Sequence, residues 1–278
     1  MKDCYRACTA TFFRLAIYSK QIQKKSRKEF IEPILRKIEM NLILDQGNSS
    51  VKVGVFNSDE LLLSERWKAL SEKKLMMLME RFTIKQALCS SVAVEEAVLL
   101  KTLKKYVPVV KTWSTTDPLP LDNCYKTPET LGKDRLAACI GANFLAPDQN
   151  LLVIDAGTAI TYDVVNANNQ YVGGSISLGL DMRRKALNHF TKRLPLVNLQ
   201  DEIPLIGTTT EEAILSGVVN GLVGEIDGFI SNLGGVYPKL LVFLTGGNTK
   251  YFEKRIKNCN FAVPDLVLIG LNRILTFK

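Results

Sequence analysis

A short pattern that occurs twice in this 278-residue chain limits the folds that it can adopt. In each copy an apolar stretch leads into Asp-x-Gly, small polar residues and a second apolar stretch. The copies are Asp45-Gln46-Gly47-Asn48-Ser49-Ser50-Val51-Lys52 and Asp155-Ala156-Gly157-Thr158-Ala159-Ile160-Thr161-Tyr162. Glycine allows the tight turn and lets the backbone approach a ligand closely. We therefore expect one strand-turn-strand unit that is used twice, once in each of two similar halves.

Apolar periodicity elsewhere predicts alternating strands and helices, which is typical of an α/β fold. Strands are expected at 42–44, 51–56, 86–90, 151–154, 159–165, 240–245 and 266–269. Helices are expected at 73–81, 93–105, 133–144, 182–191 and 210–233. A polar stretch at 147–150 marks the boundary, so we expect halves at 40–148 and 149–278, preceded by an extension at 1–39.

Positive charge is concentrated in the first 39 residues, which carry +6 of the formal net charge of +8. The remainder is close to neutral, and the basic run at 24–28 is better explained as a solvated tail or helix face than as a nucleic-acid site. Because a strand begins directly after Met40, we hypothesise that Met40 is the natural start and that residues 1–39 are an upstream extension or a dispensable tail. Nucleic acid is therefore not an expected partner.

Composition disfavours several other classes of protein. No stretch reaches the roughly 20 apolar residues of a membrane span, and the apolar stretch at 12–18 is broken by Arg14, unlike a signal peptide. Six cysteines form no CxxC pair and have no histidine nearby, which argues against a zinc site and a disulfide framework. The single histidine, His189, lies in an expected helix, so a histidine-based triad is not expected. We expect a cytoplasmic protein without a membrane partner.

Both Asp-x-Gly turns carry residue types that bind polyphosphate. Backbone N–H groups and the side chains of Asn48, Ser49 and Ser50 can donate to phosphate oxygens, and Lys52 adds positive charge. An aspartate cannot bind phosphate directly, so its chemical use is to hold a cation or a cation-bound water. One such turn is common in ordinary hairpins, but two equivalent turns predict a nucleotide clamp. A third glycine cluster, 245–248, is explained equally by contacts to the nucleotide or by a sharp strand-to-helix turn.

The most informative segment is the loop at 125–135, which leads into an expected helix. Asp134 near a helix start is favourable toward the helix dipole, but the dipole does not explain Arg135 beside it. Phosphoryl transfer to a hydroxy acid requires a carboxylate that accepts a proton from the alcohol, next to a guanidinium that holds the acidic group. The sequence therefore predicts a kinase that acts on a small molecule.

Four segments, 45–49, 131–135, 155–163 and 173–176, together resemble the type III pantothenate kinase family, and their order and spacing match throughout residues 41–278. The resemblance implies an actin-like ATPase fold with two ribonuclease-H-like halves and a nucleotide cleft between them. It implies phosphorylation of pantothenate by ATP, the first step of coenzyme A synthesis. It further implies ATP with Mg²⁺, a monovalent cation that is K⁺ or NH₄⁺, and a homodimer.

The resemblance also implies a role for each matching residue. The first phosphate loop, which binds ATP, would consist of Asp45, Gln46, Gly47, Asn48, Ser49, Ser50, Val51 and Lys52. Thr158 would contact ATP, and Asp155 would bind the monovalent cation. Asp134 would be the catalytic proton acceptor. Pantothenate would be bound by Tyr125, Gly132, Lys133, Asp134, Arg135 and Thr210.

Two positions depart from the family pattern. Ser49 stands where the family usually has Thr, which keeps the hydroxyl group. Leu178 stands where the family has Pro, which loosens that turn. Two other functions stay open at this point. A sugar or acetate kinase of the same fold would keep both Asp-x-Gly turns without needing Arg135, whereas a transcriptional accessory factor, a role described for proteins of this family, would have little need for all three aspartates.

Overall fold

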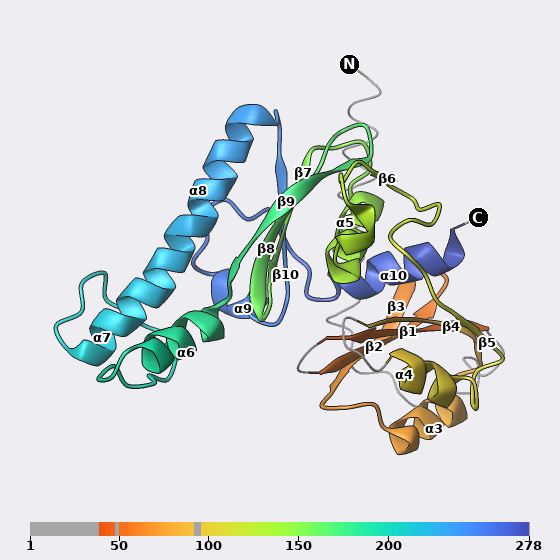
Figure 1. The fold of residues 1–278 in the computed structure, drawn as a ribbon. Helices are drawn as coiled ribbons and strands as arrows, with labels where there is room; N and C mark the ends of the chain where they lie inside the picture. Colours follow the sequence, from red (N-terminus) through yellow and green to blue (C-terminus); the bar gives the residue numbers. More distant parts are fainter. Residues whose placement is uncertain (1–38, 48–49, 92–95, 278) are drawn as a thin grey trace. The chain divides into compact units, whose positions relative to one another are not determined.

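The computed structural model describes residues 39–47, 50–91 and 96–277, and the chain divides into two compact units (Figure 1). The first unit contains Met1–Pro147 together with Leu266–Lys278, and the second contains Asp148–Asp265. Residues 1–38 of the expected extension, together with Asn48 and Ser49, lie outside the described residues.

The first unit is built on a five-stranded sheet with the order β3-β2-β1-β4-β5. Strands β1 and β2, and β2 and β3, are antiparallel, whereas β1 and β4, and β4 and β5, are parallel. The strands are β1 (Met40–Gln46), β2 (Val51–Asn57), β3 (Glu60–Trp67), β4 (Ile84–Ser91) and β5 (Val109–Lys111). The short elements β6 (Asp122–Asn123) and η1 (Pro128–Thr130) lie in the loop that follows.

Helices cover both faces of this sheet, which is why β1 is buried along five consecutive residues. On one face Leu42 and Leu44 pack in a core with residues of α3 (Glu72–Arg81) and α4 (Glu96–Leu103). On the other face lie α10 (Leu266–Thr276) and α5 (Lys133–Leu145), which contact β1 and β4 respectively.

The expectation of a strand at 266–269 is wrong, because this segment begins the helix α10. Four apolar residues do not distinguish a buried strand from a buried helix. The crossing of α10 and α5 depends on glycine: a Cβ added at Gly270 would lie 1.7 Å from the Ala137 carbonyl oxygen, and one added at Gly141 would lie 2.3 Å from that of Leu266. Helix α10 therefore belongs to the first unit, although the sequence analysis assigned residues up to 278 to the second half.

The strands of the second unit lie in the order β11-β10-β7-β8-β9. Strands β7 and β8, and β8 and β9, are antiparallel, whereas β7 and β10, and β10 and β11, are parallel. The strands are β7 (Leu151–Ala156), β8 (Ala159–Val165), β9 (Gln170–Leu178), β10 (Leu241–Thr245) and β11 (Phe261–Ala262). The helices are α6 (Leu180–Phe190), α7 (Thr210–Leu215), the π-helical turn η2 (Ser216–Asn220), α8 (Gly221–Val236) and α9 (Thr249–Phe252).

The two units have the same sheet topology, since β3-β2-β1-β4-β5 corresponds to β9-β8-β7-β10-β11 in order and direction. This confirms the expected α/β fold with two ribonuclease-H-like halves, while the nucleotide cleft stays a prediction. One detail of the sequence repeat is wrong. Asp45 pairs with Lys52 across the first turn, whereas Asp155 pairs with Thr161 across the second. The residue that corresponds to Lys52 in the second copy of the repeat is therefore Thr161 and not Tyr162. The second turn is one residue shorter than the first, which a residue-by-residue overlay does not show.

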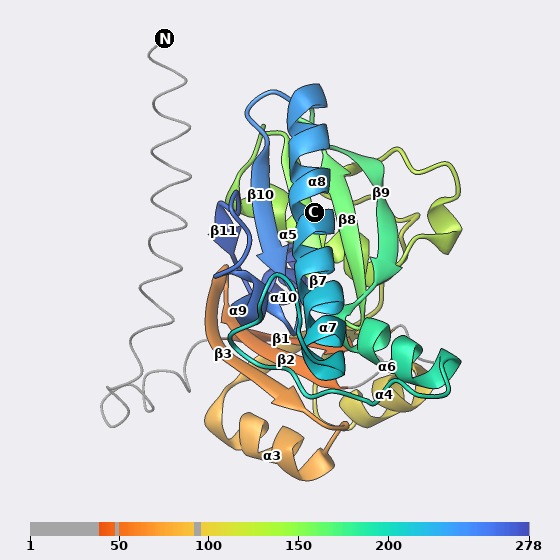
Figure 2. The same ribbon diagram turned by 90° about the vertical axis from the view of Figure 1, so that its left-hand side faces the viewer.

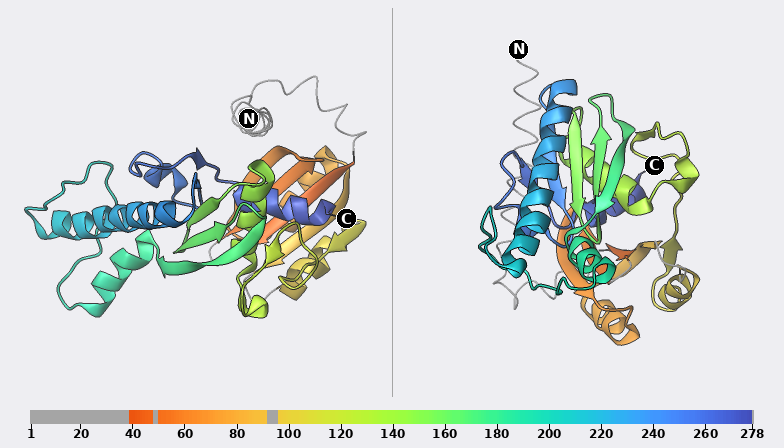
Figure 3. Two further views of the ribbon diagram at one scale, coloured as in Figure 1. Left: turned by 90° about the horizontal axis from the view of Figure 1, so that it is seen from above. Right: turned by 60° about the vertical axis from the view of Figure 1, so that its left-hand side comes forward.

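The segment Thr210–Val236 forms a continuous run through α7, η2 and α8 (Figure 3). It is long and apolar enough to cross a membrane by length and composition, contrary to the expectation that no segment is. Of its most apolar stretch of 18 residues, 44% is buried inside the protein. Leu222 and Ile226 lie fully in the core of the second unit. Helix α8 covers one face of the second sheet (Figure 2). A helix that packs in a protein core can be as long and as apolar as a helix that crosses a membrane.

Candidate functional site

The first Asp-x-Gly turn (residues 45–52) joins β1 to β2 in the first unit. Asp45 pairs with Lys52 on one side and with Ser90 of β4 on the other, so the three side chains project from the same face of the sheet. The Ser90 hydroxyl is buried and has no hydrogen-bond partner among the described residues. The Gly47 N–H donates to the Ser50 carbonyl at 3.0 Å, which closes the turn. The end of the central strand β1 thus carries a carboxylate and a lysine cation next to each other, beside the buried hydroxyl of Ser90 on β4.

The second Asp-x-Gly turn (residues 155–161) encloses the carboxylate of Asp155 between two glycines. A Cβ added at Gly246 would lie 2.3 Å from Asp155 Oδ1, and one added at Gly157 would lie 3.1 Å from the same atom. Gly246 also has a φ of +97°, which side chains rarely tolerate. Gly179 packs against the turn from a third direction, because its Cβ would lie 2.1 Å from the Thr158 carbonyl oxygen. Glycine at 246 and 179 is therefore required by the close approach of the backbones, whereas a Cβ at Gly157 would only be tight against the Asp155 carboxylate.

The third glycine cluster, 245–248, lies beside this second turn. Thr245 of β10 pairs with Asp155 of β7, and the Asn248 N–H donates to the Ala156 carbonyl at 3.0 Å. Helix α9 begins at Thr249, whose hydroxyl donates to the Gly246 carbonyl at 2.8 Å. Of the two explanations given by the sequence, the sharp strand-to-helix turn is confirmed. Contact with a nucleotide stays a prediction, and the cluster's position next to Asp155 is consistent with it.

The described residues contain no group of three or more His, Cys, Asp or Glu side chains that could hold a metal ion by themselves. A cation at the second turn would therefore depend on the Asp155 carboxylate together with backbone oxygens and ligands from outside the protein, which suits hard cations that prefer oxygen. The enclosure of the carboxylate between Gly157 and Gly246 fits that use. Where the structure describes them, the cysteines Cys89, Cys124, Cys139 and Cys259 are free thiols.

The start of α5 carries Asp134 in the first turn of the helix, where a negative charge is favourable. Gly132 is the N-cap residue, and a Cβ there would lie 2.6 Å from Asp134 Oδ1. The same oxygen accepts a hydrogen bond from the Arg135 N–H at 2.9 Å. Glycine at 132 thus makes room for the carboxylate, and the backbone at 135 fixes its orientation.

The loop before α5 brings aromatic rings next to Lys133 and Arg135, the two basic side chains at the start of that helix. Arg135 is buried, and its guanidinium carbon lies 5.9 Å from the centre of the Tyr125 ring. Lys133 Nζ lies 6.0 Å from the centre of the Trp113 ring. The structure therefore places Tyr125 beside Arg135 at the start of α5, while their contact with pantothenate stays a prediction. The sequence analysis missed Trp113, whose only signal was a large aromatic residue in the segment between β5 and α5.

Comparison with known proteins gives the family. The sequence model described as type III pantothenate kinase matches residues 41–232. A protein named type III pantothenate kinase from Phocaeicola vulgatus is 45% identical over 239 residues, which cover 86% of this chain and 99% of the relative. A protein of the same name from Cytophaga hutchinsonii is 40% identical over 246 residues, covering 86% of this chain and all of the relative.

The chain belongs to the type III pantothenate kinase family. The resemblance found in the four sequence segments is confirmed. A solved structure from Campylobacter jejuni, described as that of a Baf family transcriptional activator, has a TM-score of 0.56 and 21% identity, and covers 84% of this chain and 96% of its own. That likeness supports the fold alone.

Family membership does not by itself assign the roles of single residues, and Thr210 illustrates this. Thr210 is the first residue of α7 and is exposed. The helix is capped by Thr209, whose hydroxyl accepts from the Glu212 N–H at 3.2 Å, while Glu212 Oε2 accepts from the Thr208 N–H at 2.8 Å. Hydrogen bonds to the Glu212 carboxylate, first from the Thr208 N–H and then from the Thr208 hydroxyl and the Thr209 N–H, lower the pKa of Glu212. The capping box fixes the backbone at Thr210, whose contact with pantothenate stays a prediction.

Proposed function

We propose that this chain transfers the γ-phosphoryl group of ATP to the primary hydroxyl of pantothenate, giving 4'-phosphopantothenate in the first step of coenzyme A biosynthesis. The observation that carries the proposal is the 45% identity, over nearly the whole of the relative, to a protein named type III pantothenate kinase. The chain retains Asp45, Asp134 and Asp155, which a protein that only binds would not need together.

In this proposal Asp134 is the catalytic base. Its Oδ1 accepts the Arg135 N–H, so Oδ2 is the oxygen that takes the proton of the attacking hydroxyl. A carboxylate is a far weaker base than the alkoxide that it would have to form, and proton transfer therefore comes late in a loose transition state. Most of the acceleration then comes from positioning and from stabilisation of the spreading negative charge.

Pantothenate is held by the loop and helix start at 125–135. The Arg135 guanidinium makes charge-assisted hydrogen bonds to the substrate carboxylate, and its burial strengthens them relative to an exposed pair. Tyr125 lies against Arg135 and limits the positions that it can take. Gly132, Lys133 and Thr210 supply further contacts to pantothenate.

The nucleotide is held by the two Asp-x-Gly turns. Residues 45–52 donate backbone N–H groups and the Lys52 charge to the phosphates, and Thr158 makes a further contact to ATP. Magnesium bound with ATP neutralises phosphate charge, and a monovalent cation at Asp155, K⁺ or NH₄⁺, adds to that neutralisation. The close approach of Gly157 and Gly246 to the Asp155 carboxylate supports this role, because side chains at these positions would crowd the carboxylate.

A homodimer is part of the proposal. The second unit exposes large apolar side chains, and Phe190, Leu205 and Ile206 are each at least 80% exposed. Contiguous exposed apolar surface is typical of faces that another protein covers, and Leu205 and Ile206 are neighbours in the chain. A cytoplasmic location without nucleic-acid or membrane partners remains the expectation from the sequence.

The test is to incubate the protein with Mg²⁺-ATP and pantothenate, with and without K⁺, and to measure ADP release and the mass of the product. A product of the mass of 4'-phosphopantothenate that forms faster with K⁺ is the expected result. Parallel reactions with acetate and with a hexose in place of pantothenate test the alternative kinases of this fold. Turnover with one of these and none with pantothenate would reject the proposal.

A further inference from the structure

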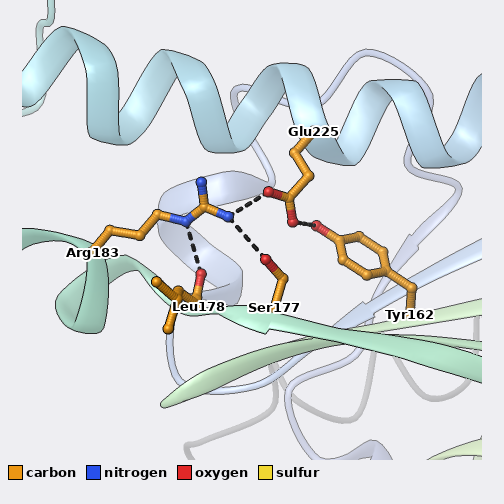
Figure 4. Close-up of polar contacts among 5 residues, drawn as sticks. All are labelled: Tyr162, Ser177, Leu178, Arg183 and Glu225. Carbon is orange, nitrogen blue, oxygen red and sulfur yellow. Dashed lines mark hydrogen bonds and ion pairs between the residues drawn. The ribbon is translucent and has the colours of Figure 1, made fainter. Parts of the chain in front are cut away.

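Five residues of the second unit form a polar network that the function described so far does not use (Figure 4). Glu225 of α8 accepts the hydroxyl of Tyr162 at 2.9 Å through Oε1, and forms an ion pair with Arg183 of α6 through Oε2. The same Arg183 reaches the end of β9, where Nη2 donates to the Ser177 hydroxyl at 3.2 Å and Nε donates to the Leu178 carbonyl at 2.8 Å. One guanidinium thus joins a long helix to the last residues of a strand.

The network is stronger than an ordinary surface ion pair. The side chains of Arg183 and Glu225 are only 21% and 25% exposed, and Tyr162 is buried and stacked on Phe229 at 4.0 Å between ring centres. Burial alone would raise the pKa of Glu225, but the hydrogen bonds from Arg183 and Tyr162 outweigh it and lower that pKa. Burial and the hydrogen bond to Glu225 raise the pKa of Tyr162. Near neutral pH Glu225 therefore stays ionised and the Tyr162 hydroxyl keeps its proton, so that both continue to hold the network together.

The end of β9 that Arg183 holds is in direct contact with the second Asp-x-Gly turn. Leu178 pairs with Ala159, the residue after Thr158. Gly179 follows and packs so closely that an added Cβ would lie 2.1 Å from the Thr158 carbonyl oxygen and 2.6 Å from that of Gly157. A shift of the Leu178 carbonyl would therefore be transmitted to the turn, because the backbones leave no space between them.

We propose that Arg183, held in place by Glu225, is a positioning residue for the turn at Gly157 and Thr158 and thereby for the nucleotide. Arg183 touches neither the substrate nor the reacting atoms; it acts through the Leu178 carbonyl. The proposal rests on the proposed function in one respect, the contact of Thr158 with ATP. Turn amides bind phosphate well only when they are fixed in direction, and a misplacement of about 1 Å can cost about 100-fold in rate.

The test compares Arg183→Met with Arg184→Met, a matched control on the same helix. Arg184 is also partly buried and also pairs with an acid, Asp181, but its other hydrogen bond goes to the Val197 carbonyl and not to β9. For Arg183→Met we expect the KM for ATP to rise about tenfold, while the KM for pantothenate changes less than twofold. Hydrogen exchange of the backbone amides at 157–160 should become at least about tenfold faster. Arg184→Met should leave all three quantities unchanged.

A second variant keeps the proposal testable if Arg183→Met does not fold. Glu225→Gln keeps an oxygen for the Tyr162 hydroxyl but removes the charge that holds Arg183, and we expect a smaller rise of about threefold in the KM for ATP. Equal increases in both KM values, or exchange at 157–160 that does not differ from the control, would overturn the proposal. Faster exchange with an unchanged KM for ATP would overturn the nucleotide role.

Failure of the proposed function would be recognised separately. A wild-type protein without pantothenate turnover would reject the reaction, whereas the exchange at 157–160 and the affinity for a non-hydrolysable ATP analogue can still be compared between Arg183→Met and Arg184→Met. A loss of analogue affinity confined to Arg183→Met would support the positioning role in that case, and equal affinities would overturn it.

Discussion

Replacing Gly246 with alanine tests the central feature of the second turn, the enclosure of the Asp155 carboxylate. Gly246 is buried and has a φ of +97°. The added Cβ would lie 2.3 Å from Asp155 Oδ1 and 2.7 and 2.8 Å from the carbonyl carbon and the nitrogen of Ala156. The carboxylate can move, but the backbone of the central strand β7 cannot move without disturbing the sheet. We therefore expect Gly246→Ala to change both the free energy of unfolding and the turnover of the protein.

The magnitude follows from two costs. A side chain at a sparsely populated positive φ costs about 1–3 kcal/mol, and a methyl group forced into a packed region costs about 1–3 kcal/mol more. We expect Gly246→Ala to lose about 2–6 kcal/mol of the free energy of unfolding. This is a large part of the roughly 5–15 kcal/mol that stabilises a typical protein. Because the methyl group displaces Asp155, the proposed dependence of turnover on K⁺ should weaken as well.

The measurement is urea unfolding followed by circular dichroism, together with turnover as a function of K⁺ concentration. Gly224→Ala is the matched control, because Gly224 is exposed within α8 and an added Cβ would meet nothing within 4 Å. That control should gain about 0.5–1 kcal/mol, as expected for alanine in place of glycine within a helix. If Gly246→Ala unfolds within about 0.5 kcal/mol of the wild type and keeps its K⁺ dependence, the reasoning about the enclosure is refuted.

Three further predictions follow from single contacts. Asp134→Asn keeps the oxygen that accepts the Arg135 N–H, so unfolding should be unchanged while turnover falls about 100-fold or more; near-normal turnover would reject the base assignment. Gly270→Ala places a Cβ 1.7 Å from the Ala137 carbonyl oxygen and should lose about 1–3 kcal/mol or more in urea unfolding; an unchanged midpoint would contradict the close crossing of α5 and α10. The pKa of Glu225 is lowered from its ordinary value of 4.5, so its stabilising contribution is present above that value and is lost as the pH falls through the lowered pKa. Glu225→Gln should therefore make the free energy of unfolding less dependent on pH below about 4.5, and equal slopes for the two proteins would argue against the ionised pair.

Local patterns in the sequence determined much of the fold and of the candidate site. The Asp-x-Gly turns follow from short apolar strands and a glycine, and the helix that begins at Lys133 follows from its apolar periodicity. These features involve residues within a few positions of each other, so their physical causes can be read directly. Strands β3 and β9 were missed, because both carry runs of exposed residues and lack a regular alternation of buried and exposed positions.

The sequence by itself located both turns, but only the tertiary structure decided the length of the second turn and what packs against the two turns. The segment 266–269 carries an apolar signal that suits either a strand or a helix, and its packing on α5 made it a helix of the first unit. Gly246 meets Asp155 through the pairing of β10 with β7, and Arg183 meets Glu225 across 42 positions of the chain. Such contacts join residues that are distant in sequence, and a local pattern specifies neither partner because each is selected by the packing of the whole unit.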